Sequence, residues 1–158
     1  MKKFREYLMS GKLAAMVCES VQGESVKNAS MVYNVLKPLV SQTKDVEQIW
    51  LMCLDAKNCI KTIEKITAGT LSNCVVYRRE IVKTLIKCEA SACILVHNHP
   101  SGDPDPSGDD NVTTRLVAMS CAAIDVTLHD HVVIGSQGRF FSYADSGLIE
   151  KYCKEEVV

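Results

Sequence analysis

Apolar and polar positions divide the chain into a helical first part and a longer part in which strands and helices alternate. Apolar residues recur at helical spacing in 4–19 and again in 25–40, and Gln22-Gly23 interrupts the pattern between them. Apolar positions three and four residues apart form one face of a helix, and a glycine between such segments favours a turn. We therefore expect two helices in residues 1–44, packed as a lead-in on the core that follows.

Beyond this lead-in the pattern predicts one domain of strands and helices over residues 45–158. Apolar runs at 49–54 and 59–67 flank the polar segment 55–58, and such a pair of runs is typical of a β-hairpin. The remaining predicted elements are a helix at 78–88, a strand at 91–97, a helix at 107–122, strands at 125–128, 131–134 and 139–142, and a closing helix at 143–154.

Composition narrows the class of protein. The chain has 158 residues with 47% hydrophobic content, which is enough for one domain to bury its own core. The formal net charge is -1 and the basic residues are spread along the chain, so the clustered positive charge of a nucleic-acid-binding protein is missing. The charged start of the chain and the lack of a long apolar stretch predict a cytoplasmic protein without a membrane span.

The eight cysteines do not form a metal or disulfide pattern. No Cys-x-x-Cys pair occurs, and most of the cysteines lie within apolar runs. Free cysteine is among the most buried residue types, and cytosolic thiols stay reduced. We interpret them as small buried side chains in preference to a disulfide framework.

One segment argues specifically for chemistry. His97 ends the predicted strand 91–97 and His99 follows two residues later, so both side chains lie on one face if the strand continues. Ser107 follows a Pro-Asp-Pro turn and is a natural N-cap, so Asp110 falls in the first turn of the next helix, near the histidines. Two imidazoles and one carboxylate suit Zn(II), with a fourth position left for water. The same ligand set also serves Fe(II) oxygenases, so the residues alone leave iron open.

The motif has a counterpart in a known superfamily. His97-x-His99, then seven residues, then Ser107-x-x-Asp110 resembles the metal-binding motif of JAB/MPN (JAMM) metalloproteases. The resemblance implies one Zn(II) per chain on His97, His99 and Asp110, and a hydrolytic reaction.

A longer similarity indicates one branch of that superfamily. The string at 95–104, with Arg79-Glu80 upstream and 130–135 downstream, is similar to RadC proteins, and the similarity covers about Ser25 to Leu148. It implies an α/β fold, a single-domain mixed β-sheet flanked by helices, of the kind also seen in cytidine deaminases. Deaminase chemistry itself is disfavoured, because that family requires His-x-Glu and Pro-Cys-x-x-Cys, and the chain has neither.

The resemblance also implies a glutamate as general acid and base, on the first strand after a helix. Glu47 fits, because the string that follows it, 48–55, is similar to the first strand of RadC proteins. Glu80 is the rival, although the helix dipole also explains a carboxylate at the start of a helix. We favour Glu47, because the base must reach the attacking water. Ser107 would donate to the developing oxyanion in addition to capping its helix.

A second His-x-His, His129-Asp130-His131, has two interpretations. The similarity to RadC proteins covers Asp130 and His131 but not His129. We favour a buried, hydrogen-bonded core pair over a contact behind the metal ligands.

Three classes of function stay open. The first is a zinc-dependent peptidase or isopeptidase with a protein or peptide substrate. The second is a DNA-repair or DNA-processing factor; longer RadC-like proteins have an N-terminal helix-hairpin-helix module, but the region before Asp45 contains only Gly11 and Gly23 and no Gly-x-Gly turn. The third is a non-catalytic scaffold, which we rank last because the chain retains every ligand of the motif. The sequence identifies neither the substrate nor the oligomeric state.

Overall fold

The computed structural model describes residues 11–40, 46–68 and 74–155. These residues form a five-stranded sheet with strand order β2-β1-β3-β4-β5. The strands are β1 Gln48–Leu54, β2 Ile60–Ala68, β3 Ala92–Asn98, β4 Thr127–Ile134 and β5 Phe140–Ser142. Strands β3 and β4 run parallel and the other neighbours run antiparallel. The sheet is therefore mixed, and the expected α/β fold is confirmed.

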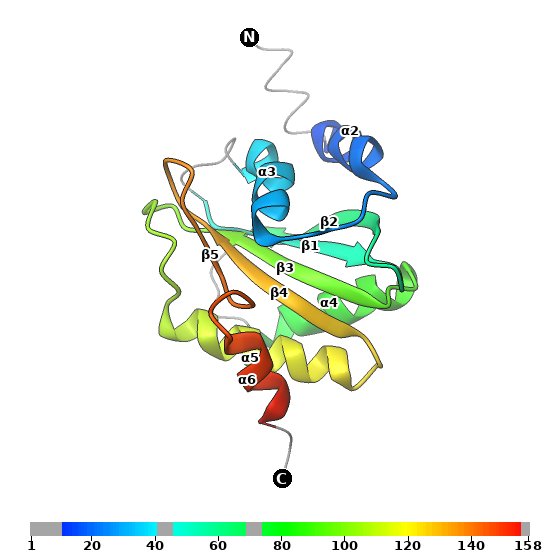
Figure 1. Cartoon of the computed structure of the whole chain (residues 1–158), viewed down its shortest axis with the longest axis vertical. Coiled ribbons are helices and arrows are strands. Elements are labelled where there is room, and N and C mark those ends of the chain that lie inside the picture. Colours follow the sequence, from blue (N-terminus) through cyan, green and yellow to red (C-terminus); the bar gives the residue numbers. More distant parts are fainter. Residues whose placement is uncertain (1–10, 41–45, 69–73, 156–158) are drawn as a thin grey trace.

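Helices cover both faces of this sheet (Figure 1). Helices α2 Lys12–Val21 and α3 Ala29–Val40 lie on one face. Helices α4 Cys74–Lys87, α5 Gly108–Ala122 and α6 Leu148–Lys154 lie on the other. The result is a three-layer arrangement with a hydrophobic core on each side of the sheet.

Strands β1 and β3 form the centre of the sheet, and all of their residues are buried. Leu51 lies opposite Leu95, and Met52 opposite Ile94. Because successive side chains of a strand point to opposite faces, the first pair joins the core beneath α4, α5 and α6 and the second joins the core beneath α3. A strand buried on both faces has a continuous apolar sequence, which explains why these two strands could be predicted.

Several predicted elements are confirmed with small changes at their ends. The predicted hairpin forms β1 and β2, the predicted strand at 91–97 is β3, and the predicted helix at 107–122 is α5 with Ser107 as its N-cap. The helix predicted at 78–88 begins earlier, at Cys74. Of the helix predicted at 4–19, residues 4–10 lie outside the described residues, as does the predicted domain boundary at 44/45.

The helix predicted at 25–40 begins only at Ala29, because the residues before it pair with the β1–β2 hairpin. Ser25 forms an isolated β-bridge with Cys59, and the backbone N–H of Val26 donates to the carbonyl oxygen of Asn58 at 2.9 Å. Backbone groups that pair with a neighbouring strand are not available for the first turn of a helix. Helix α3 nevertheless packs on the sheet.

The prediction of two separate strands at 125–128 and 131–134 is wrong, because one strand, β4, spans the polar residues between them. Cys93 pairs with Leu128 and Ile94 with Asp130, so His129 is an extra residue in the pairing with β3. A β-bulge accommodates one such residue without ending the strand.

The closing helix is shorter than the predicted 143–154. It begins at Leu148, after a turn that ends at Gly147 with φ of 77°. Glycine adopts this left-handed conformation without the steric cost that a side chain brings. Tyr143, which lies before this turn and outside the helix, is fully buried in the core.

Seven cysteines fall among the residues whose side chains are described, and all seven are free thiols. Cys53, Cys93 and Cys121 are buried, whereas Cys153 is exposed. A contact with Cys121, together with burial, raises the pKa of the Cys93 thiol. These three buried thiols match the interpretation as small core side chains. None of the described helices is both long enough and apolar enough to cross a membrane.

Candidate metal centre

The end of β3 and the start of α5 bring the two histidines and Asp110 together. His97 is the last but one residue of β3 and is 1% exposed, while His99 follows the strand. The side chain of His97 points to the face covered by α5, because residues two apart in a strand share a face and Leu95 lies in the core beneath α5. Asp110 lies in the first turn of α5 and is also 1% exposed.

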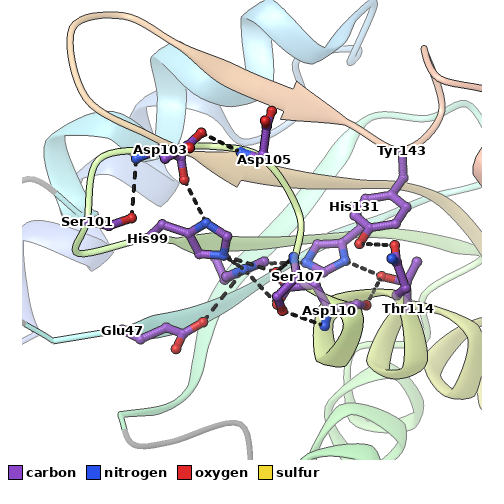
Figure 2. Close-up of polar contacts among 12 residues, drawn as sticks. Glu47, His99, Ser101, Asp103, Asp105, Ser107, Asp110, Thr114, His131 and Tyr143 are labelled. Atoms are coloured by element: carbon purple, nitrogen blue, oxygen red, sulfur yellow. Dashed lines mark hydrogen bonds and ion pairs between the residues drawn. The ribbon is translucent and has the colours of Figure 1, made fainter.

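Pairing of β1 with β3 adds a fourth residue. Ile49 lies opposite His97, so Glu47, two residues earlier, projects from the same face toward the histidines (Figure 2). Ligand atoms of Glu47, His97, His99 and Asp110 all lie within 4.8 Å of one another. The sequence motif and the upstream glutamate therefore meet at one point.

The distances between these ligand atoms are short. His97 Nε2 lies 2.9 Å from His99 Nε2 and 3.2 Å from Asp110 Oδ1. His99 Nε2 lies 3.0 Å from Asp110 Oδ2. Glu47 Oε1 lies farther out, 3.6 Å from His97 Nε2.

A capping box fixes the carboxylate of Asp110. The Ser107 side chain accepts the backbone N–H of Asp110 at 3.0 Å, and Asp110 Oδ2 accepts the backbone N–H of Ser107 at 2.7 Å. Burial alone would raise the pKa of Asp110, but the contacts with His97, His99 and the Ser107 N–H outweigh it and hold that pKa well below its ordinary value. Asp110 is therefore an anion at neutral pH.

The loop after β3 sets the protonation of His99. His99 Nδ1 lies 2.7 Å from the carbonyl oxygen of Asp103, and a carbonyl oxygen can only accept. Nδ1 must therefore carry a proton, and the neutral ring then has its lone pair on Nε2, the atom that faces Asp110. A second proton on Nε2 could be donated to Asp110 Oδ2, so the nearby carboxylate raises the pKa of His99, against the opposing effect of burial.

Two carboxylate oxygens of the cluster have no hydrogen-bond donor. Glu47 Oε1 and Asp110 Oδ1 are buried and make no hydrogen bond in the structure. An unpaired buried acceptor costs about 1–3 kcal/mol, and more when it is charged. Two imidazole nitrogens and two carboxylates around one point require positive charge between them, either a metal ion or additional protons.

Glu80, the rival for the catalytic base, lies elsewhere. It is on α4 and pairs with Lys83 at 3.9 Å, with 44% of its side chain exposed. Burial raises the pKa of Glu47, an effect that His97 opposes and Asp110 reinforces. A raised carboxyl pKa suits a group that must exchange a proton near neutral pH. The position of Glu47 fits a base, and its role stays a prediction.

Ser107 has the structural role that was predicted for it. It caps α5 through the hydrogen bond from Asp110, and its side chain is exposed. Its oxygen accepts in that bond, so the hydroxyl proton remains for another acceptor. Donation of this proton to an oxyanion stays a prediction.

The three residues of the second His-x-His have separate roles. His129 is exposed and contacts Asn58 at 2.8 Å. Asp130 is buried and accepts from Ser142, Ala144 and His131, and so holds the turn after β5. His131 is buried, as the favoured interpretation predicts, but its Nε2 also lies 2.7 Å from His97 Nδ1. His131 therefore also makes the contact that the alternative interpretation expects, to the far side of a candidate ligand, His97.

Sequence reasoning missed two residues that support the cluster. Thr114 lies one helical turn after Asp110 and is fully buried, so the spacing of four residues in the predicted helix was a usable signal. Asn98 lies between the two histidines, and its side chain contacts the backbone on both sides of Glu47. That contact depends on strand pairing and has no local signal.

Comparison with known proteins agrees with this arrangement. Residues 26–148 match the family described as the RadC-like JAB domain. A UPF0758 protein of Symbiobacterium thermophilum is 38% identical over 122 residues, which are 77% of this chain and 51% of that protein. A UPF0758 protein of Rhodobacter capsulatus is 43% identical over 106 residues, 67% of this chain and 49% of the relative.

The chain spans about half the length of these curated relatives. The family match nevertheless covers most of the chain, including all four residues of the cluster. By its sequence, its mixed sheet and its cluster of two histidines and two carboxylates, the chain belongs to the RadC-like JAB domain family.

Proposed function

We propose that the protein is a zinc-dependent hydrolase that cleaves amide bonds in a peptide or protein substrate. The observation that carries the proposal is the convergence of His97 and His99 on the carboxylates of Glu47 and Asp110, whose buried oxygens Oε1 and Oδ1 have no hydrogen-bond donor. A divalent cation would satisfy all four groups at once.

The donor set fits zinc. Zn(II) binds imidazole nitrogen and carboxylate oxygen, and a catalytic site has three protein ligands and an open position. His97, His99 and Asp110 would be the three ligands. Glu47, whose oxygen is the most distant from His97, would remain outside the ligand set. The same donors suit Fe(II), so metal analysis has to decide between the two ions.

Partial exposure favours a catalytic site over a purely structural one. The side chains of His99 and Glu47 are 15% and 23% exposed, whereas those of His97 and Asp110 are both 1% exposed. One side of the cluster is therefore open to solvent, and a substrate can approach from that side.

Each residue then has a specific task. When bound, the cation supplies a Lewis acid that makes water acidic enough to ionise near neutral pH. Glu47 accepts a proton from the attacking water and later delivers it to the leaving amine. The Ser107 hydroxyl donates to the oxygen on which negative charge develops.

Metal analysis and a substrate screen test this proposal. Purified wild-type chain should contain about one zinc ion, and His97→Ala should contain much less. The zinc-loaded protein should hydrolyse substrates from a panel of isopeptide-linked, linear peptide and DNA molecules, with activity confined to the amide substrates. An unchanged zinc content in His97→Ala would contradict the assignment of His97 as a zinc ligand. Cleavage of DNA alone would replace amide hydrolysis by the DNA-processing alternative.

A further inference from the structure

A chain of hydrogen bonds connects His97 to the backbone of Asp110 through two residues outside the cluster. His97 Nδ1 lies 2.7 Å from His131 Nε2, and His131 Nδ1 lies 2.6 Å from Thr114 Oγ1. The Thr114 hydroxyl donates to the carbonyl oxygen of Asp110 at 2.6 Å. Figure 2 shows Thr114 on α5 and the ring of His131 next to it.

The last bond in this chain fixes the direction of the bond before it. A carbonyl oxygen accepts only, so the Thr114 proton is committed to Asp110. Thr114 Oγ1 must then accept from His131, which places the His131 proton on Nδ1. A neutral imidazole has one N–H, so His131 Nε2 is an acceptor.

The ring of His131 is neutral because it is 1% exposed and contacts His97, Thr114 and Tyr143, with no ion pair to its side chain among the described residues. Charging a buried ring without a partner is costly. His97 Nδ1 must therefore be the donor to His131. The lone pair of neutral His97 is then on Nε2, the atom that faces Glu47 and Asp110.

We propose that His131 and Thr114 are positioning residues that hold His97 in the tautomer competent to bind a cation. Free imidazole populates both tautomers, and a proton on Nε2 would block the ligand position. The ring that fixes the tautomer is itself held in place: Tyr143 stacks on His131 with centroids 5.0 Å apart, and the Tyr143 hydroxyl donates to Asn111 at 2.9 Å. The tautomer of His97 exists without metal. Its effect on cation binding is the only part of this inference that rests on the proposed function.

The two histidines are thus oriented by different means. His99 is fixed by the backbone carbonyl of Asp103 in the adjacent loop. The relay through His131 and Thr114 instead ends on the backbone of Asp110, which joins a ligand of β3 to the start of α5. A change at Thr114 should therefore affect His97 more than His99.

Nitrogen-15 NMR of the ring nitrogens in the full metal-free chain tests the relay directly. We expect wild-type His97 to carry a proton on Nδ1, directed at His131. Thr114→Ser retains the hydroxyl and should retain that tautomer. Thr114→Val is similar in shape but has no hydroxyl, so both tautomers of His97 should appear. The zinc affinity of Thr114→Val, measured by chelator competition, should fall about 10- to 100-fold, whereas Thr114→Ser should bind like the wild type.

His131→Phe removes the acceptor and retains an aromatic ring, so it should also mix the His97 tautomers and weaken zinc binding. The matched control is His129→Phe, because His129 is exposed in the same strand and does not contact the cluster. His129→Phe should change neither the tautomer of His97 nor the zinc affinity.

A wild-type His97 with its proton on Nε2 would overturn the relay, as would a folded Thr114→Val with wild-type tautomer and zinc affinity. If circular dichroism shows that Thr114→Val is unfolded, the tautomer of His97 in the wild type and in Thr114→Ser still tests the relay. A proton on Nδ1 in both proteins supports it, and a proton on Nε2 alone contradicts it. An Nδ1-protonated His97 in a protein that hydrolyses nothing would support the relay and contradict the proposed function. The two ideas can therefore fail separately.

Discussion

Asn98 holds Glu47 in place by contacting the backbone on both sides of it. The Asn98 side-chain oxygen accepts the N–H of Gln48 at 2.8 Å, and its amide donates to the carbonyl oxygen of Val46 at 3.1 Å. The segment that carries Glu47 lies just before β1 begins, and these two bonds fix it to the end of β3. Asn98 thus orients the segment that carries Glu47, while its neighbours, His97 and His99, belong to the cluster.

Replacing Asn98 should therefore separate metal binding from hydrolysis. In Asn98→Ala the backbone at Glu47 loses both bonds, so we expect the free energy of unfolding to fall by about 1–3 kcal/mol and hydrolysis to weaken, with zinc still bound. Thermal unfolding, zinc content and turnover would be measured together. A loss of zinc as large as in His97→Ala would mean that Asn98 organises the ligands themselves.

Glu47→Gln should retain zinc and lose hydrolysis. The amide is nearly the same size as the carboxylate but cannot accept the water proton, so the rate should fall at least about 10²-fold. Glu80→Gln is the matched control, because Glu80 pairs with Lys83 away from the cluster. Full turnover by Glu47→Gln with an inactive Glu80→Gln would transfer the role of base to Glu80.

Zinc should stabilise the fold, because the buried carboxylate oxygens of Glu47 and Asp110 have no donor without it. At a free zinc concentration about 100 times the dissociation constant, the free energy of unfolding should rise by about 2.7 kcal/mol. Differential scanning calorimetry with and without a chelator measures this change. His99→Ala should show much less stabilisation, and an equal gain in both proteins would point to zinc binding elsewhere in the chain.

Gly135→Ala should disturb the loop that orients His99. A Cβ at this position would lie 2.6 Å from the Gly102 carbonyl oxygen and 2.8 Å from Pro104 Cδ, both next to Asp103. We expect a loss of about 1–3 kcal/mol in the free energy of unfolding and weaker zinc binding. Gly108→Ala is the control, because a Cβ there would have no atom of another segment within 4 Å. Denaturant titration that finds equal losses in both variants would contradict the steric argument.

By itself the sequence determined several of the local elements and the candidate ligand motif. The continuous apolar runs of β1 and β3, the turn before Ser107 and the helical spacing after it are local patterns. They placed His97 and His99 at the end of a strand and Asp110 in the first turn of α5, where the structure has them. Local patterns suffice here because alternation along a strand and capping of a helix act over only a few residues.

The resemblance to RadC proteins indicated Glu47, but only the tertiary structure decided how distant residues meet this motif. The antiparallel register that sets Ile49 opposite His97 brings in Glu47 from a distant part of the sequence. The parallel pairing of β3 with β4, with its bulge at His129, sets His131 behind His97. A one-residue shift in either pairing would turn these side chains to the opposite face of the sheet. The register depends on the packing of both cores at once, and a single stretch of sequence does not determine it.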